Sequence, residues 1–287
     1  MSTLSLLLAT ALLLAGAMAA AWLVARHPGR SGWTDVFWSF AIGAAGVLVS
    51  LAPRPAGSVI PSPRQIMVAA LVAIWALRLG LHIAVRTRHH GEDPRYAALR
   101  EEWGPRFPLR LFLFLQIQAA AALLLVASIL LAARNPAPHL GWGDALGAAI
   151  LMGAIAGEGL ADRQLSRFRA DSANPQSTQG GRVCDKGLWS LSRHPNYFFE
   201  WLGWTAYAVI ALAPSAHPAT AWVALTGPIF MYILLAQVSG VPPLEAHMLK
   251  SRGPAFRSYQ ARVPAFWPIP RPTRPNRPPN LAKEPDA

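Results

Sequence analysis

The densest group of chemically active side chains lies within residues 180–204, which read GGRVCDKGLWSLSRHPNYFFEWLGW. Its polar members at the head of an apolar run are Arg193, His194, Asn196, Tyr197 and Glu200. Pro195 favours the first turn of a helix, and there Asn196 and Glu200 share one face. Burying a carboxylate and a carboxamide is costly unless something pairs with them. The motif therefore predicts a site for a polar cofactor at the membrane–water boundary.

A second candidate group lies in the third apolar stretch. Arg78, His82 and Arg86 are spaced by four residues, so on a helix they form one stripe. A long side chain that reaches back to the membrane interface explains Arg86. Arg78 lies about 12 Å deeper at 1.5 Å per residue. A guanidinium at that depth requires a carboxylate, a backbone carbonyl or a ligand phosphate.

The loop after this stripe reads GEDPRYAALREEWGPRF. Pro94 favours the start of a short helix, with Asp93 at its positive N-terminal end. One interpretation is an amphipathic helix that lies on the membrane surface with solvated charges. The other is a clamp in which Arg86 and Arg95 bind the phosphates of a cofactor, with Tyr96 beside them as a candidate catalytic residue.

A third group ends the fifth apolar stretch. Glu158 and Asp162 are four residues apart, and Arg169 lies seven residues beyond Asp162, so all three can share one helical face. A carboxylate accepts hydrogen bonds from ribose or adenine groups, and an arginine binds phosphate. The alternative is a ladder of salt bridges within one helix that caps the span.

Two further positions carry candidate side chains. Asp35 lies near the head of the second apolar stretch, within WTDVFWSF. It is either an N-cap, which Thr34 also supplies, or an acid whose buried carboxyl group donates a hydrogen bond to a substrate carbonyl. Glu245 and Tyr259 follow the last apolar stretch, in a segment whose pattern predicts a basic amphipathic helix.

The composition indicates what must position these groups. The chain has 287 residues, of which 53% are hydrophobic and 14% charged, whereas soluble domains average about 25% charged residues. The net charge of +12 comes almost entirely from arginine. Apolar runs of this kind argue against a nucleic-acid-binding protein and indicate positively charged loops on one side of a membrane. Cys184 is the only cysteine, so an intrachain disulfide is excluded. We expect this residue to have no part in the chemistry.

Seven stretches are long and apolar enough to be transmembrane helices: about 4–25, 34–52, 65–86, 109–133, 142–161, 196–213 and 219–238. Lys and Arg concentrate after the first, third, fifth and seventh stretches, whereas the opposite side has only Arg54, Arg64 and Arg134. By the positive-inside rule, the fold class is an all-α integral membrane protein with seven transmembrane helices, the N-terminus outside and the C-terminus in the cytoplasm.

The predicted domain organisation is simple. Residues 1–263 form one seven-helix membrane domain, whose cofactor-binding half covers about 142–263. Residues 264–287 form a cytoplasmic tail rich in Pro and Arg, a composition typical of extended, disordered segments.

Several motifs together resemble a known family. GLWSLSRHPNYFFEWLGW, the later Glu245 and the closing VPAFWP are similar to the C-terminal half of the membrane steroid 5-alpha-reductases, and closest to a bacterial branch of uncharacterised multi-span proteins of the DUF1295 type. DVFWSFAIG and GEDPRYAALREEWGPRF extend the likeness over most of the chain. The isoprenylcysteine and phospholipid methyltransferases share the pattern G-x-W/Y-x-x-x-R-H-P-x-Y and the ending Y-x-x-x-V-P, so the motif alone does not separate the two families.

The reductase resemblance implies a role for each group. Asn196 and Glu200 match an N-x-x-x-E motif that binds the nicotinamide amide and the nearby ribose. Asp162 and Arg169 match the segment that binds the adenosine half, although the family has Asn near the place of Glu158. The implied cofactor-binding residues are Arg86, Arg95, Glu158, Asp162, Arg169, Arg193, His194, Asn196, Tyr197, Glu200, Glu245 and Tyr259.

The chain departs from this family where the substrate binds. The family has a Gln-Glu pair near the place of Asp35 and Val36, and a tyrosine where this chain has Ile83 after His82. These differences leave the cofactor half intact and put the steroid-specific half in doubt. Asp35 and Tyr96 are the candidate catalytic residues, and no metal site is predicted.

Three functions follow as hypotheses. The first is an NADPH-dependent oxidoreductase that reduces a C=C bond conjugated to a carbonyl in a steroid-like or other lipid. The second is a methyltransferase that uses S-adenosylmethionine on a lipid or isoprenylcysteine-like substrate. The third is a non-enzymatic membrane protein or transporter, although transporters usually place their polar groups near the bilayer midplane. A monomer in the inner membrane of a bacterium, without a nucleic-acid partner, fits the first two.

Overall fold

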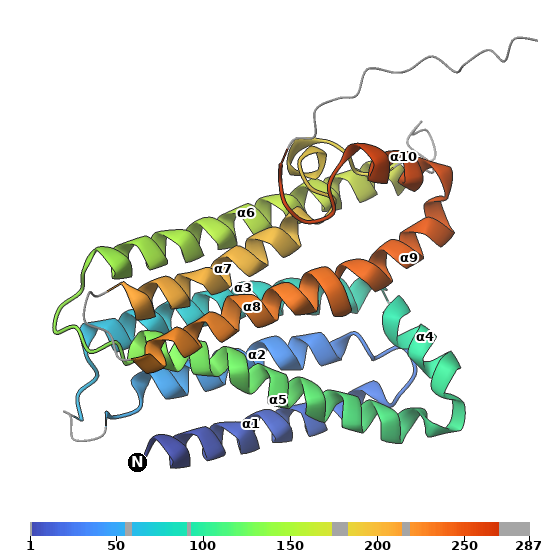
Figure 1. Cartoon of the computed structure of the whole chain (residues 1–287). Coiled ribbons are helices and arrows are strands. Elements are labelled where there is room, and N and C mark those ends of the chain that lie inside the picture. Colours follow the sequence, from blue (N-terminus) through green and yellow to red (C-terminus); the bar gives the residue numbers. More distant parts are fainter. Residues whose placement is uncertain (1, 55–58, 91–92, 174–182, 214–218, 270–287) are drawn as a thin grey trace, which may run out of the picture.

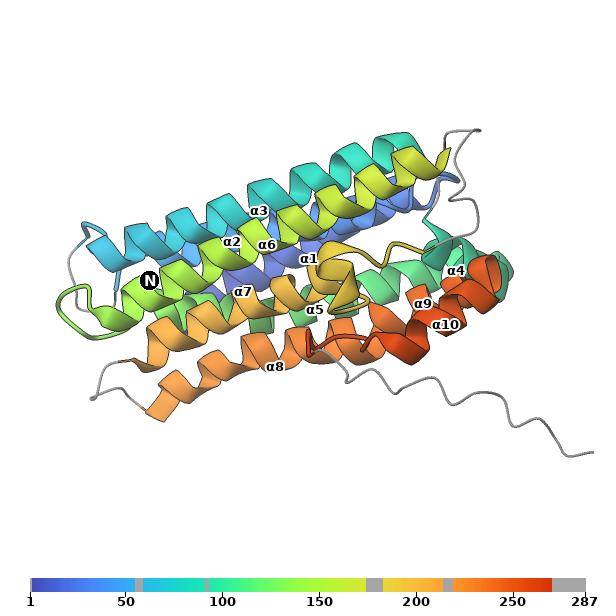
Figure 2. The same ribbon diagram turned by 90° about the horizontal axis from the view of Figure 1, so that it is seen from above.

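The computed structural model describes residues 2–54, 59–90, 93–173, 183–213 and 219–269, and these ranges contain helices and no strand. The long helices lie side by side in one bundle (Figures 1 and 2). They are α1 (Thr3–Ala25), α2 (Trp33–Leu51), α3 (Pro63–His90), α5 (Phe107–Ala133), α6 (Trp142–Ala173) and α7 (Pro195–Leu212), beside which the short α8 (Thr226–Tyr232) continues a row of helical turns. Short helices complete the chain: α4 (Pro94–Trp103), η1 (Gly104–Arg106), η2 (Gly187–Ser190), η3 (Ala219–Leu225), η4 (Ile233–Val238), α9 (Val241–Arg252) and α10 (Pro254–Arg262).

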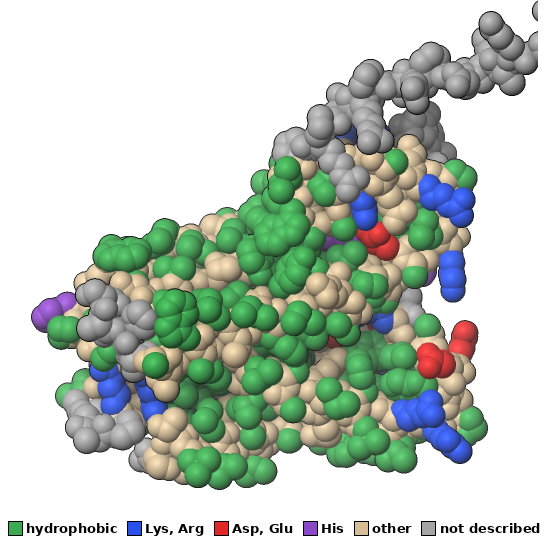
Figure 3. Space-filling model, in the orientation of Figure 1, with side chains coloured by type: hydrophobic (Ala, Val, Ile, Leu, Met, Phe, Trp, Pro, Cys, Tyr) green, Lys and Arg blue, Asp and Glu red, His purple; other side chains and the backbone are tan. Residues whose placement is uncertain are grey.

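The bundle has the surface of a membrane protein. Within the described residues, six helical segments are long and apolar enough to cross a bilayer, and α7 is not among them. Exposed leucines such as Leu8 and Leu12 line the outside of α1. Hydrophobic side chains cover most of the visible side of the bundle, and charged side chains gather at its ends (Figure 3). The all-α membrane fold class is therefore confirmed, whereas the count of seven spans and the sidedness stay predictions.

Close packing between helices depends on glycine at two interfaces. A Cβ on Gly157 of α6 would lie 2.4 Å from the ring of Phe199 of α7, and a Cβ on Gly43 of α2 would lie 2.2 Å from that of Ala76 of α3. Small residues let helix backbones approach closely inside a membrane. These contacts fix α7 against α6 and α2 against α3, and so set the places of the polar side chains that α3, α6 and α7 share.

The ends of two predicted spans differ from the structure. The fifth span, predicted over 142–161, continues as one helix to Ala173, because the polar residues that follow keep helical periodicity. The seventh, predicted over 219–238, is a succession of 3₁₀, α and π turns, η3, α8 and η4. Most of the predicted tail, residues 270–287, lies outside the described residues.

The two ends of the bundle have different contents. We call the end that holds residues 193–200 the motif end; it also holds α4, α9 and α10, and lies at the right of Figure 1. The opposite end holds the connections that follow α2 and α5. Pro94 begins α4, and Asp93 is its N-cap, accepting a hydrogen bond from the backbone N–H of Arg95 at 2.9 Å. The predicted short helix after the third span is confirmed.

Candidate functional site

A group of polar side chains from α3, α6 and α7 lies inside the bundle toward the motif end. We call it the polar core; it consists of Arg78, His82, Glu158, Asp162, Asn196 and Glu200. The guanidinium of Arg78 contacts Glu158 Oε1 at 2.5 Å and also pairs with Asp162. A guanidinium at the depth of Arg78 was expected to need a partner such as a carboxylate, and the structure provides two carboxylates. Both acids face α3, so they bridge two helices instead of forming a ladder along α6.

Glu200 occupies the most enclosed part of the polar core. Its carboxylate accepts hydrogen bonds from the indole N–H of Trp75, at 2.9 Å to Oε2, and of Trp204, at 2.9 Å to Oε1. The residue is 7% exposed. The motif predicted Glu200 at a polar mouth, whereas its side chain lies in the interior, where indoles from α3 and α7 bind it.

Asn196 lies nearer the motif end and is half-buried. Its Nδ2 donates to Asp162 Oδ1 at 3.4 Å, and its Oδ1 accepts from the backbone N–H of Tyr197 at 3.1 Å. The ring Nε2 of His82 lies 3.5 Å from Asp162 Oδ2. Asp162 is thus the residue on which Arg78, His82 and Asn196 meet, and the long contacts of the last two leave their polar atoms available to a ligand.

Three arginines from different helices gather outside the polar core. Arg86 of α3, Arg169 of α6 and Arg252 of α9 are exposed, and the charge of Arg169 is repelled by those of Arg86 and Arg252 and attracted by Asp162. The convergence of Arg86 and Arg169, two predicted phosphate ligands far apart in sequence, is therefore present in the fold. A cluster of like charges is suited to an anion that neutralises it.

Arg95 takes a different position. It forms an ion pair with Asp35 of α2 at 2.5 Å and a second with Asp93 at 2.9 Å, so this pair of acids already neutralises it. Burial raises the pKa of Asp93, but the hydrogen bonds and charge of Arg95 outweigh it, and the pKa lies below its ordinary value. Asp35 is not the N-cap of α2, which begins after Gly32. Tyr96 is 3% exposed, and its phenol lies beside Thr34 and Gln118.

Tyr197 connects these groups. Its phenol lies close enough to Arg95 and Arg86 to interact with their charges, and its ring stacks on that of His194 with centroids 5.5 Å apart. The predicted candidates on α3, α4 and α7 therefore surround one region of the motif end.

A network of hydrogen bonds joins Arg193, His194, Glu245 and Gln260; we call it the C-terminal latch. Glu245 accepts hydrogen bonds from Arg193 Nε at 2.7 Å and Nη2 at 3.0 Å, and from Gln260 Nε2 at 2.7 Å, and it lies 3.0 Å from His194 Nε2. Arg193 also donates to the carbonyl of Val263 at 2.5 Å. The latch ties α9, α10 and the following chain to the start of α7, so these predicted cofactor ligands bond to one another.

Burial sets the protonation of the latch histidine. It lowers the pKa of His194 below its ordinary value, and Glu245 acts in the opposite direction. Near neutral pH the ring is therefore neutral, and one of its nitrogens is available as a donor to Glu245.

Tyr259 also has a structural partner. Its hydroxyl donates to the carbonyl of Trp189 in η2 at 2.5 Å, and burial raises its pKa. Gly187, at φ 61°, begins η2 and lies against Gln164, whose Oε1 accepts from the backbone N–H of Leu188 at 3.0 Å. Burial also raises the pKa of Cys184, which fits a bystander cysteine.

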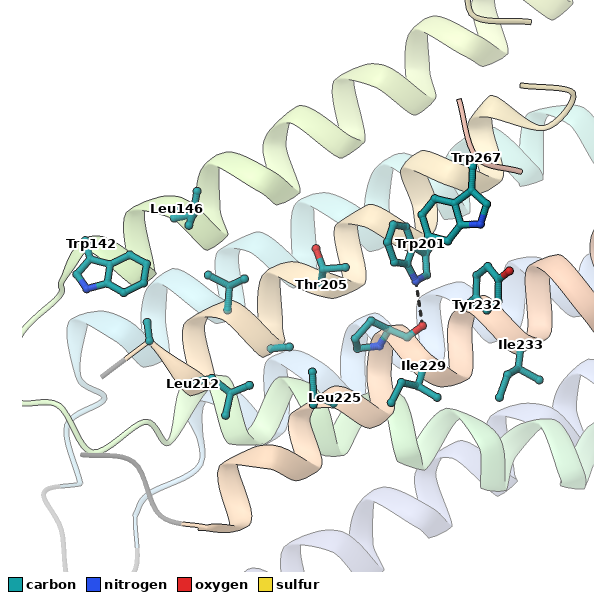
Figure 4. Close-up of a pocket in the computed structure, with 14 residues that line it drawn as sticks. Trp142, Leu146, Trp201, Thr205, Leu212, Leu225, Ile229, Tyr232, Ile233 and Trp267 are labelled. Carbon is teal, nitrogen blue, oxygen red and sulfur yellow. Dashed lines mark hydrogen bonds between the residues drawn. The ribbon is translucent and has the colours of Figure 1, made fainter. Parts of the chain in front are cut away.

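A separate cavity of about 700 Å³ lies between α6, α7 and α8. Trp201, Thr205 and Leu212 of α7 line it with apolar residues of α6 and α8 (Figure 4). None of the predicted site residues lines it. Glu200 and Trp204 point to the other side of α7, toward α3. This groove and the polar core are therefore on different faces of one helix.

Sequence reasoning missed four contributors: Trp75, Trp204, Arg252 and Gln260. A signal existed for two of them. Trp75 lies three residues before Arg78 on the same helical stripe, and Trp204 lies four residues after Glu200, which places each beside a predicted polar residue. Arg252 and Gln260 reach the site only through the fold of α9 and α10, which no spacing in the sequence reveals.

The family described as "Protein of unknown function (DUF1295)" matches residues 21–263. No curated protein and no solved structure matches the chain. The matched region contains the polar core, the arginine cluster and the C-terminal latch.

Proposed function

The chain belongs to the DUF1295 family, and we propose that it is a membrane-embedded NADPH-dependent oxidoreductase that reduces a C=C bond conjugated to a carbonyl in a lipid substrate. In this proposal the motif end faces the cytoplasm of a bacterial cell, where soluble nucleotides are, and the protein works as a monomer in the inner membrane.

One observation carries the proposal. Arg86 and Arg169 converge directly outside a polar core that offers the carboxamide of Asn196 and the carboxylate of Asp162. A dinucleotide needs both elements: cations for its phosphates and paired donors and acceptors for its amide and ribose. Arg252 adds a third cation to this region.

The residues fit such a cofactor, which when bound supplies a hydride to the β-carbon of the substrate. The protein then has to bring a proton to the substrate. Asp35 and Tyr96 are the proposed sources, and Asp35 is held by Arg95. A phosphate that binds Arg95 competes with this ion pair and releases the carboxyl group toward the substrate carbonyl. Cofactor binding would thereby prepare the acid.

The alternative is a methyltransferase that uses S-adenosylmethionine. It stays open because the R-H-P-x-Y motif, whose Arg193 and His194 are bound in the C-terminal latch, and the ending V-P are common to both families. S-adenosylmethionine has no phosphate, so it gives no reason for the approach of Arg86 to Arg169.

A matched pair of variants tests the proposal. Arg169→Ala is expected to weaken NADPH binding about ten- to a hundredfold, because a charge-assisted hydrogen bond is worth about 1.5–3 kcal/mol. Arg167→Ala removes an exposed arginine two residues away on the same helix and is expected to leave the affinity unchanged. The measurement is a titration of the detergent-purified proteins with NADPH and NADH. Equal affinity of both variants for NADPH would contradict the phosphate assignment.

A further inference from the structure

At the opposite end of the bundle, a few arginines lie close together. The connections at that end contain only three Lys or Arg residues, Arg54, Arg64 and Arg134. Although they are far apart in sequence, they gather around the end of α5. Their arrangement is independent of the polar core and of the function proposed for it.

Arg64 shows what a fully satisfied guanidinium looks like here. Its Nε and Nη2 bind the two carboxylate oxygens of Asp144 at 2.7 and 2.8 Å. Its remaining donors bind the carbonyls of Ala137 at 2.5 Å and His139 at 2.6 Å. The residue is 4% exposed. Arg64 therefore contributes no uncompensated charge.

Arg134 is the contrasting case. Its Nη1 donates to the hydroxyl of Thr3 at 2.8 Å. Its Nε and Nη2 are buried and have no hydrogen-bond partner among the described residues. These two atoms form the same edge with which Arg64 binds Asp144, and that edge matches two oxygens of a carboxylate or phosphate.

Arg54 lies close to Arg134 and repels it. Burial and then the charge of Arg54 lower the pKa of Arg134. Arg54 Nη2 makes only long contacts, at 3.3 Å to Ser62 Oγ and 3.4 Å to the carbonyl of Ala133, and its Nε is buried without a partner in the described part of the chain. Neither arginine has an ion pair with a carboxylate of the described residues.

Capping of helix ends does not explain this arrangement. A cation at a helix C-terminus is favourable, and Arg54 reaches a carbonyl at the end of α5. That contact uses one nitrogen and leaves the bidentate edge of Arg134 unused. Two like charges with buried, unpaired donors are costly unless an anion compensates them.

We propose that Arg54 and Arg134 bind a phosphate group, either of a phospholipid headgroup or of free phosphate, at the end of the bundle remote from the polar core. A cavity of about 260 Å³ lies beside Arg54 and is lined also by Ser62, Arg64 and His139, so it leaves room for the group on the Arg54 side of the pair. The side-on edge of Arg134 binds two phosphate oxygens, and Arg54 Nε donates to a third.

The test measures thermal stability of the full-length protein with two probes. In neutral detergent, inorganic phosphate is titrated against sodium chloride of equal ionic strength. In nanodiscs, phosphatidylglycerol is compared with phosphatidylcholine. The variants are Arg54→Gln and Arg134→Gln, and Arg110→Gln removes an exposed arginine at the other end of α5 as a control.

Wild type and Arg110→Gln are expected to melt higher with the anionic probe, and the two site variants are expected to bind it about tenfold or more weakly. A response to both probes identifies the phosphate group as sufficient, and a response to phosphatidylglycerol alone identifies the lipid headgroup. No response of wild type to either probe, or an equal response of the site variants, would overturn the proposal.

Discussion

Replacing Arg78 with methionine tests the polar core most severely. Arg78 bridges Glu158 and Asp162, and the side chains of the three residues are 18%, 7% and 10% exposed. Removing one partner of a buried ion pair costs about 3–5 kcal/mol, because the other charge is left uncompensated. Since all three side chains are mostly buried, screening by water reduces this figure little. We expect Arg78→Met to lower the free energy of unfolding by about 3–5 kcal/mol.

The assay is equilibrium unfolding in mixed micelles of neutral detergent and dodecyl sulfate, followed by tryptophan fluorescence. Arg88→Met removes an exposed arginine from the same helix, and so corrects for the effect of one charge on the micelle. The triple variant Arg78→Met, Glu158→Gln, Asp162→Asn removes all three charges and is expected to recover most of the loss, since no charge is then left unpaired.

Two results would refute this reasoning. If Arg78→Met unfolds like Arg88→Met, the ion pairs of Arg78 do not stabilise the bundle. If the triple variant is as unstable as Arg78→Met, the loss reflects the packing of the arginine side chain and not the uncompensated charge of the acids.

Two other predictions concern the latch and the helix packing. The pKa of His194 is lowered in the folded protein, so the unfolded chain binds a proton first as pH falls below about 6.5. The folded protein therefore loses stability in that pH range. The melting temperature of His194→Gln should depend less on pH there than that of wild type. Gly157→Ala places a methyl group against an aromatic ring of α7 and should cost about 1–3 kcal/mol. Gly153→Ala meets no atom within 4 Å and should cost nothing; equal unfolding curves for the two glycine variants would show that α6 and α7 adjust freely.

The fold class was predictable because apolar runs of membrane length dominate the sequence. Each predicted span corresponds to helical structure, since in lipid the backbone has to satisfy its own hydrogen bonds. The extent of α6 was not predictable from hydropathy, because most residues from Asp162 to Ala173 are polar. They remain helical because one face is needed against α3 and η2.

The sequence predicted which residues belong to the candidate site better than it predicted which of them contact one another. Spacing placed Arg78 on a stripe that needs a carboxylate, and the structure supplies Glu158 and Asp162. It could not show that Glu200 is bound by two indoles, or that Arg193 and Glu245 bind each other. Such partners lie on other helices, and their proximity depends on which helices pack together.

The central claim is that the motif end binds a phosphate-bearing dinucleotide. The most direct measurement is the thermal stability of the wild-type protein in neutral detergent with NADPH, NADH and S-adenosylmethionine in parallel. A ligand at a hundred times its dissociation constant stabilises a protein by about 2.7 kcal/mol, which is readily detected. We predict stabilisation by NADPH, less by NADH at the same concentration, and none by S-adenosylmethionine. Stabilisation by S-adenosylmethionine with no response to either nicotinamide cofactor would contradict the account and favour the methyltransferase.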